Sequence, residues 1–302
     1  MSTEQLMYAV VPVPFTPALL VSTTATETVA AYNPATTYAA GAQARLDTTG
    51  RIYTSLQAAN TGNAPDTSPL WWVDVAPANR LAMFDSRIAT QTTAASPLVV
   101  VLQPGALCTN LALLNLVGAS VTVEVLVSAV VVYTKTVDLQ GAMIGDWLDY
   151  YFEPSEQITV ALFDDLPLYT APQIRITLTG TGTVAVGHCI FGLRRDLGAL
   201  QYGAQAQLVD YSRKETDEFG ETVFVQRDFA DEFSGQLMTD NGQVNSVKRT
   251  LRSLRATPTL FVGVSDSRFA ELFVAFGWVR SHRIAVQYPM HSLIDLEIGA
   301  LT

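Results

Sequence analysis

The most constraining feature of the chain is a short stretch, residues 32–75, that holds two of its four tryptophans and three of its tyrosines. Three runs hold these aromatic residues, Tyr32-Asn-Pro-Ala-Thr-Thr-Tyr38, Gly50-Arg-Ile-Tyr53 and Trp71-Trp72, and a polar run, Asn60-Thr-Gly-Asn-Ala-Pro65, lies between the last two. A segment this small cannot build an aliphatic core of ordinary size. Its aromatic side chains must therefore form a miniature core or present flat faces on which a ligand stacks.

Both uses of these aromatic residues remain open from the sequence. A sugar site needs flat rings against pyranose C–H faces and polar neighbours for the hydroxyls. The stacking candidates are Tyr38, Tyr53, Trp71 and Trp72, with Asn60, Asn63, Asp66 and Arg51 as hydrogen-bonding neighbours. In the alternative, Tyr38, Tyr53 and one tryptophan form the core of the segment and leave little aromatic surface exposed.

Composition excludes some function classes. The chain has 302 residues, of which 49% are hydrophobic and only 15% charged, so it can bury large cores in two or three domains. With so few charges, much of its surface must be neutral polar or covered by neighbouring chains. The formal net charge of −10 argues against nucleic-acid binding, which needs clustered Lys and Arg.

The termini, cysteines and apolar runs give weaker constraints. Cys108 and Cys189 lie in apolar strand-like runs, where Cys usually acts as a small buried hydrophobe, and a disulfide between them stays open. The first residues lack a basic secretory region, which favours synthesis in a cytoplasm. The most apolar run, residues 121–133, contains Glu124 and is too short to span a bilayer, so we expect no membrane insertion.

The chain is predicted to be mainly β and divides into four segments. Residues 1–30 carry prolines at positions 12, 14 and 17 and are predicted to form an extended arm or an edge strand. Residues 31–78 form the small aromatic module. Residues 79–196 contain short β-branched runs broken by Gly, Asp and Pro, as in a β-sandwich. Several of these runs alternate at period two, as at Val121, Val123 and Val125.

The last segment, residues 197–302, is predicted to be a β-β-α-β-β domain. Residues 210–220 read as a charged turn and are followed by a strand pair, an amphipathic helix and at least three more strands. Asp240 or Asn241 is expected to cap the helix. Its apolar face and its basic face are formed by two sets of residues: Val244, Val247, Leu251 and Leu254, and Lys248, Arg249, Arg252 and Arg255.

The basic helix face has two interpretations. It is either a solvated surface or a contact with the acidic surface of a neighbouring subunit, which a chain of charge −10 offers widely.

Catalytic chemistry finds little support. His188, His282 and His291 are separate in the sequence and make no zinc pattern with the two cysteines. No nucleophile elbow, phosphate-binding loop or dinucleotide fingerprint is present. We therefore expect no catalytic residue, no metal and no cofactor. Acidic groups that a glycosidase would need occur at Asp164-Asp165, where a turn is expected, and at Asp146, Asp149 and Glu153.

Two of the predicted domains resemble known folds. The spacing of the aromatic module resembles the family 5/12 carbohydrate-binding modules, which are small three-stranded domains found on chitin-degrading enzymes. Members that bind chitin carry an exposed tryptophan pair where this chain has Ser55-Leu-Gln-Ala-Ala-Asn-Thr, so the resemblance concerns the fold more than the ligand. The sandwich segment resembles a galactose-binding-like jelly roll.

The chain as a whole resembles tail proteins of long-tailed phages and prophages. Five runs carry this resemblance: Trp71-Trp-Val-Asp-Val-Ala-Pro-Ala-Asn-Arg-Leu-Ala-Met-Phe-Asp85, Asp146-Trp-Leu-Asp-Tyr-Tyr-Phe-Glu-Pro154, Leu197-Gly-Ala-Leu-Gln-Tyr-Gly203, Val209-Asp-Tyr-Ser-Arg-Lys-Glu-Thr-Asp-Glu-Phe-Gly220 and Ser292-Leu-Ile-Asp-Leu-Glu-Ile-Gly-Ala-Leu301.

This resemblance implies a minor tail protein in the tail tip or baseplate of a virion. It also implies a homo-oligomer, a trimer or hexamer, in contact with other tail proteins and with host-surface glycan through the aromatic module. The C-terminal segment would form the ring. Two hypotheses of other classes stand beside it: a dedicated receptor-binding lectin of the virion, and a glycan-cleaving enzyme.

Overall fold

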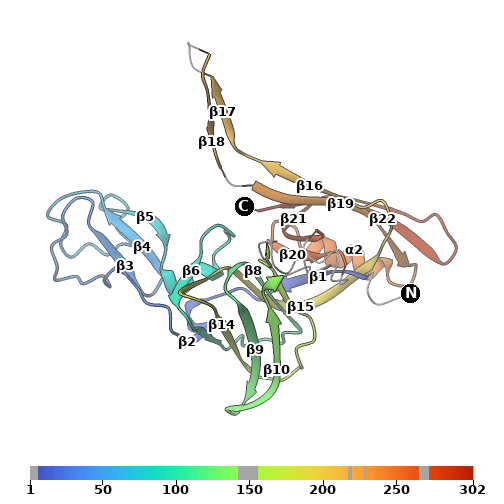
Figure 1. The fold of residues 1–302 in the computed structure, drawn as a ribbon, viewed down its shortest axis with the longest axis horizontal. Coiled ribbons are helices and arrows are strands. Elements are labelled where there is room, and N and C mark those ends of the chain that lie inside the picture. The colour runs from blue at the N-terminus through green and yellow to red at the C-terminus, as the bar shows by residue number, and fades with distance from the viewer. Residues whose placement is uncertain (1–5, 142–155, 217–219, 228, 265–271, 302) are drawn as a thin grey trace, which may run out of the picture. The chain divides into compact units, whose positions relative to one another are not determined.

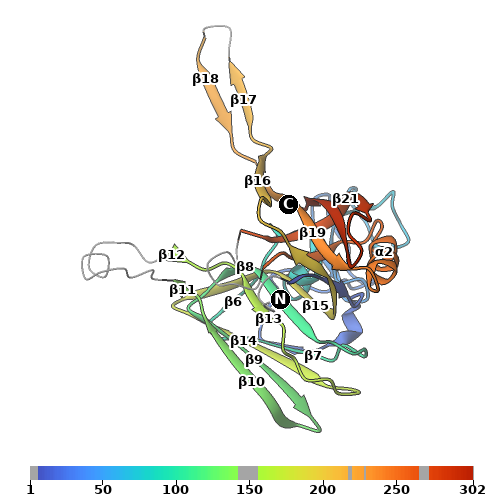
Figure 2. The same ribbon diagram turned by 90° about the vertical axis from the view of Figure 1, so that its right-hand side faces the viewer.

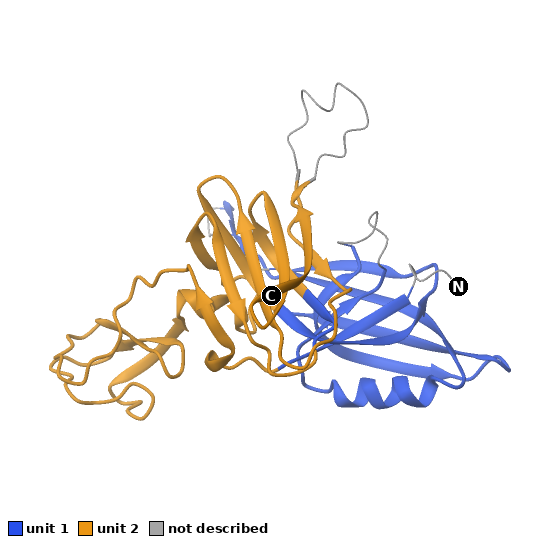
Figure 3. Ribbon diagram, turned by 90° about the horizontal axis from the view of Figure 1, so that it is seen from below, with its two compact units in different colours: residues 1–13, 108–111, 190–302 blue, residues 14–107, 112–189 orange. Residues whose placement is uncertain are grey.

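The computed structural model describes residues 6–141, 156–216, 220–227, 229–264 and 272–301 (Figure 1). Strands dominate these residues, and the one α-helix among them is α2 (Val244–Ser253), which confirms a mainly β fold. The chain forms two compact units (Figure 3). Unit 1 comprises Met1–Val13, Cys108–Leu111 and Ile190–Thr302, and unit 2 comprises Pro14–Leu107 and Ala112–Cys189.

Unit 2 contains a five-stranded antiparallel sheet in the order β10-β9-β14-β7-β2. The alternation predicted from the sequence appears as one buried face: Val121, Val123 and Val125 are buried, and so are the three apolar residues of β14. The bounds of the strands are β2 (Leu20–Thr23), β7 (Leu98–Leu102), β9 (Ser120–Val127), β10 (Val130–Asp138) and β14 (Gln173–Thr179), and the short helix η2 (Pro17–Leu19) precedes β2.

A second group of strands in unit 2 supplies the opposing buried side chains of a sandwich-like fold. β8 lies between β13 and β15, and β6 pairs with residues 183–186 of β15 (Figure 2). Leu113, Phe163, Val184 and Val186 are buried in these strands. The bounds are β6 (Thr92–Ala95), β8 (Asn110–Val117), β13 (Ala161–Phe163) and β15 (Thr183–Leu200), with a two-stranded pair of β11 (Gln140–Gly141) and β12 (Glu156–Gln157). Gln157-Ile-Thr-Val-Ala-Leu162, one of the short β-branched runs of the sandwich segment, is divided between β12 and β13.

The aromatic module is a separate three-stranded antiparallel sheet within unit 2, as predicted. β3 (Gln43–Leu46), β4 (Arg51–Ser55) and β5 (Trp72–Pro77) follow one another in this order. The turn before β4 needs a glycine, because Gly50 has a φ of +67° and a Cβ there would collide with the Leu81 side chain. Leu81 belongs to the short helix η3 (Asn79–Phe84), which connects the module to the sandwich.

Unit 1 is built on one sheet in the order β15-β1-β20-β21-β22-β19-β16. Unit 2 ends and unit 1 resumes at residues 189 and 190 inside β15, whereas the sequence placed the domain boundary at 196 and 197, also inside β15. The bounds of the strands are β1 (Leu6–Pro12), β16 (Gln205–Asp210), β19 (Phe229–Asp240), β20 (Thr259–Val262), β21 (Val274–Ala285) and β22 (His291–Ala300), and a separate pair is formed by β17 (Arg213–Thr216) and β18 (Thr222–Val225).

The N-terminal segment differs from the expected arm or edge strand. β1 pairs with β15 on one side and with β20 on the other, so it is an interior strand, and residues 7–10 are buried. The prolines do not prevent this pairing, because Pro12 is the last residue of β1 and Pro14 and Pro17 lie beyond it.

The amphipathic helix is present, but its cap is not the predicted one. Val247, Leu251 and Leu254 of the helical segment are buried in the core of unit 1, which also contains Phe261 and Ile294 of the sheet. The N-cap residue is Gln243, without a side-chain hydrogen bond. Asp240 and Asn241 are used elsewhere: the first accepts from the Gly242 amide, and the second donates to the carbonyls of residues 288 and 289.

The strand pairing around the charged segment also differs from the prediction. β18 does not pair with β19 but with β17, which lies in the segment expected to be a turn. β19 pairs instead with β16 and β22. β21 continues to Ala285, so residues 280–285 do not form a further strand of their own.

Candidate functional site

Two of the four predicted stacking residues form the core of the aromatic module. Trp72 is 3% exposed and Tyr53 9% exposed, and they pack around Ala44. The indole N–H of Trp72 donates to the Asn63 carbonyl at 2.9 Å, which satisfies the polar atom that burial would otherwise leave unpaired. These two rings therefore hold the module together and are not a surface for a ligand.

The other two, Tyr38 and Trp71, are half-buried at the margin of this core together with Tyr32. The rings of Tyr32 and Tyr38 stack with centroids 5.8 Å apart and an interplanar angle of 18°. Tyr38 also meets Trp72 edge-on at 5.0 Å. Sequence reasoning included Tyr32 in the module but not among the stacking candidates. Tyr32, Tyr38 and Trp71 are the aromatic residues that keep partly exposed faces here.

The hydroxyl groups of the two stacked tyrosines differ. The Tyr38 hydroxyl accepts a hydrogen bond from the Asn33 amide at 2.8 Å. The Tyr32 hydroxyl oxygen is buried and has no hydrogen-bond partner among the described residues. A buried hydroxyl without a partner costs free energy, so the Tyr32 hydroxyl destabilises the module, whereas the Tyr38 hydroxyl stabilises it.

The polar residues proposed for a sugar site are mostly engaged within the module. Asn60 is fully buried, donates to the Ser55 hydroxyl at 2.9 Å and accepts from Asn63 at 2.9 Å. Arg51 makes a two-pronged contact with both carboxylate oxygens of Asp74. Asp66 is exposed. The hydrogen-bonding capacity left for a ligand beside the aromatic rings is therefore small.

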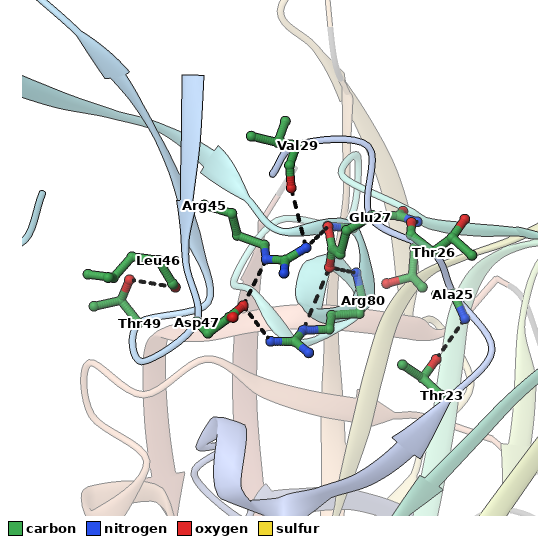
Figure 4. Close-up of polar contacts among 12 residues, drawn as sticks. Thr23, Ala25, Thr26, Glu27, Val29, Arg45, Leu46, Asp47, Thr49 and Arg80 are labelled. Carbon is green, nitrogen blue, oxygen red and sulfur yellow. Dashed lines mark hydrogen bonds and ion pairs between the residues drawn. The ribbon is translucent and has the colours of Figure 1, made fainter. Parts of the chain in front are cut away.

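A charge network fixes the module to the segments that flank it (Figure 4). The Glu27 carboxylate accepts from the backbone amides of Asn79 and Arg80, each at 3.0 Å, at the start of η3. It also lies 3.9 Å from the Arg45 guanidinium and 3.7 Å from that of Arg80. Asp47 joins both arginines, at 2.8 and 2.9 Å. The network links β3, η3 and the segment before the module, so its role is structural.

The acidic candidates do not form a catalytic pair in the described part of the chain. Asp165 accepts from the Tyr133 hydroxyl at 2.7 Å and from Lys135 at 2.9 Å. Partial burial acts to raise the pKa of Asp165, but these two hydrogen bonds outweigh it and the pKa is lowered. A carboxylate held charged in this way is a poor general acid. Asp146, Asp149 and Glu153 lie outside the described residues.

His188 and the two cysteines are core residues, whereas His282 is exposed and His291 half-buried. His188 is buried, and burial lowers its pKa to about 4. Burial raises the pKa of the Cys108 thiol to about 11, and no disulfide joins it to Cys189. No group of three or more His, Cys, Asp or Glu side chains that could hold a metal ion occurs within the described ranges.

The basic helix face is fully on the surface. Lys248, Arg249, Arg252 and Arg255 are all exposed, and no acidic residue interrupts the segment 248–255. Across the part of the chain that the structure covers, no ion pair involves any of these four side chains. The structure thus leaves a concentrated positive surface on a chain of net charge −10.

The most exposed element of unit 1 is the β17–β18 hairpin, which extends away from the sheet (Figures 1 and 2). Every residue of both strands is exposed, including Phe224 at 74% and Val223 at 56%. Sequence reasoning expected a strand at β18 but missed the hairpin, because it treated residues 210–220, which contain β17, as a turn. The Thr-Val-Phe-Val run of β18 is typical of a strand, whereas the Arg-Lys-Glu-Thr run of β17 is mostly charged.

Comparison with protein-family models gives no match for this chain, and comparison with curated proteins gives none either. Within the described residues, no helix has both the length and the apolar character that crossing a bilayer requires.

Proposed function

We propose that the chain is a non-enzymatic structural subunit of a phage tail tip or baseplate, which works as a homo-oligomer in contact with other tail proteins. The observation that carries this proposal is the β17–β18 hairpin. An isolated two-stranded hairpin is at best marginally stable in water, and large apolar side chains at its surface mark an interaction site. A subunit of an assembly has such a hairpin because neighbours cover it.

Two further features support an assembly role. β16 is an edge strand of the unit 1 sheet, and its residues, including Leu208, are exposed or nearly so. An open edge of this kind is a template for pairing with another chain. The resemblance of the chain to tail proteins of long-tailed phages adds the location, a virion made in a host cytoplasm.

The test is to purify particles of the phage or induced prophage that encodes the chain. Mass spectrometry should find the chain in a fixed ratio to the other tail proteins, and antibodies against it should label the end of the tail in electron micrographs. Particles from a deletion mutant, complemented in trans, serve as the control. Infectious particles that lack the chain would contradict the proposal.

A receptor-binding role is the second candidate, favoured by the half-buried faces of Tyr32, Tyr38 and Trp71. Trp71→Ala is the suitable probe, because Trp72 belongs to the core and its loss would unfold the module. Binding of the isolated chain to host-surface glycan should be lost in Trp71→Ala, while the amides of the module strands stay protected from hydrogen exchange. This result would support the role. A wild-type chain that binds no host glycan would exclude it.

A further inference from the structure

The β17–β18 hairpin carries apolar side chains on both faces. In its register Lys214 lies opposite Phe224 and Glu215 opposite Val223. Because side chains alternate along a strand, Val223 and Val225 share one face and Phe224 lies on the other. All three are exposed in unit 1. A partner that buries all three side chains must therefore contact both faces of the hairpin.

Unit 1 has a second exposed apolar surface, the turn between β21 and β22. Val286 is 73% exposed and Met290 69%, and Tyr288 beside them is also exposed. This turn is held in place by Asn241, whose amide donates to the carbonyls of residues 288 and 289 and accepts from the Ser292 hydroxyl. Three large apolar side chains on a tethered turn are a preformed docking surface.

The hairpin and this turn lie at opposite ends of β19. The hairpin connects to β19 at Phe229, whereas the other end of the strand, Asp240, pairs with His291 next to the turn. Twelve residues of strand separate the two surfaces by about 36 Å. Figure 1 shows them at the two ends of β19. The hairpin therefore cannot cover the turn of its own chain.

The two surfaces also match in charge. Toward the closed end of the hairpin, Glu215 lies opposite Val223 and pairs with Arg213, and Glu221 lies three residues or about 10 Å from Phe224. The basic side chains of α2 begin near the turn, since Asn241 precedes the helix, and Arg252 lies eight residues or about 12 Å after Val244. An apolar contact at the turn would thus place the acidic end of the hairpin over the basic helix face.

We propose that the β17–β18 hairpin of one copy docks on the β21–β22 turn and the basic face of α2 of a second copy. This inference rests on the proposed homo-oligomer and names its contact. The contact is heterologous: each chain offers a hairpin and a docking surface that do not overlap, so successive copies join head to tail and close into a ring or continue as a filament.

A mixing experiment tests the contact directly with the full-length chain. Val223→Ser with Phe224→Ser removes the hairpin surface, and Tyr288→Ser with Met290→Ser removes the docking surface. Each double variant alone should be monomeric in analytical ultracentrifugation. Mixed in equal amounts they should form a one-to-one heterodimer and nothing larger, because one intact hairpin and one intact docking surface remain.

Charge reversal tests the polar half of the contact. Arg249→Glu with Arg252→Glu should weaken self-association at least tenfold at low salt, where exposed charges are least screened. Adding Glu215→Arg and Glu221→Arg to the same chain should restore at least half of the loss. Leu70→Ser on the aromatic module is the matched control, because Leu70 is as exposed as Phe224 and lies far along the chain from both surfaces.

The outcomes separate this inference from the proposed function. A wild-type chain that assembles, with both double variants assembling equally well, overturns the hairpin contact and leaves the structural role in place. Two monomeric variants that do not combine on mixing overturn the head-to-tail arrangement in the same way. A wild-type chain that stays monomeric at all concentrations, and is absent from purified particles, overturns both.

Discussion

The aromatic module and the β17–β18 hairpin are both small β structures rich in large apolar side chains, and they use these side chains in opposite ways. The module turns Trp72 and Tyr53 inward, and the indole N–H of Trp72 is hydrogen-bonded. The hairpin turns Val223, Phe224 and Val225 outward. The number of strands explains the contrast: three strands and their connecting loops can enclose a core, whereas two strands cannot.

The two regions therefore differ in how far their stability depends on other molecules. The module is complete within one chain, because its rings pack against one another and the Glu27 carboxylate is hydrogen-bonded to two backbone amides. The hairpin gains nothing from burial in its own chain, so its stability must come from another molecule.

The largest effect is expected from truncating the core ring of the module. Trp72→Ala should lower the free energy of unfolding of the module by about 3–5 kcal/mol, because it leaves a cavity and removes the bond to Asn63. Phe224→Ala in the monomeric chain should change stability by less than about 0.5 kcal/mol. Amide hydrogen exchange over residues 43–77 measures the first, and urea unfolding of the dilute chain measures the second. A stable module in Trp72→Ala would contradict the proposed core.

The next effect concerns the ion pairs of the two regions. Glu27→Gln should destabilise the module by about 2–3 kcal/mol, because two backbone amides and two arginines lose a charged partner. Arg213→Ala removes the exposed pair with Glu215 on the hairpin and should cost about 0.5 kcal/mol or less. Thermal unfolding of both variants distinguishes the two values. Equal losses would show that the network does not support the module.

Acidification should weaken the sandwich through His188. His188 is neutral when buried because its pKa is lowered to about 4, so the unfolded state binds a proton below about pH 6.5 while the native state does not. Stability is therefore full above about pH 7.5 and falls by about 2 kcal/mol between pH 7.5 and 5. His188→Gln should flatten this loss, whereas His282→Gln, at an exposed site, should retain it. A flat profile in the wild type would refute the assignment.

The smallest effect comes from the two stacked tyrosines of the module. Tyr32→Phe removes a buried hydroxyl without a partner and should stabilise the module by about 1 kcal/mol. Tyr38→Phe removes the bond to the Asn33 amide and should destabilise it by a similar amount, about 1 kcal/mol. Urea unfolding of the two variants in parallel gives the sign of each change. Two changes of the same sign would contradict the hydrogen-bonding pattern.

Local patterns were sufficient for much of the fold. The alternation of Val121, Val123 and Val125 predicted a half-buried strand, and the helical spacing of Val247, Leu251 and Leu254 predicted the buried face of the helical segment. Both signals arise because the period of the side chains matches the period of the element. The three-stranded sheet of the module agrees with what the resemblance to family 5/12 carbohydrate-binding modules implied.

Long-range choices could not be predicted from the sequence. Nothing local to residues 6–12 shows that β15 and β20 lie on both sides of them. Adjacent residues of a strand point to opposite faces, so sequence alone does not decide that Trp72 is core and Trp71 is half-buried. The pairing of β18 with β17 was missed for the same reason, because which strands pair is determined by the tertiary structure and not by the local sequence.

The most direct test of the account is amide hydrogen exchange on the full-length chain at low and at high concentration. If the hairpin is covered only by another copy, amides of residues 213–216 and 222–225 should exchange quickly in the dilute chain and become strongly protected in the concentrated one. Amides of residues 43–77 should be equally protected in both. A hairpin whose exchange does not change with concentration, in a chain that does assemble, would contradict the account.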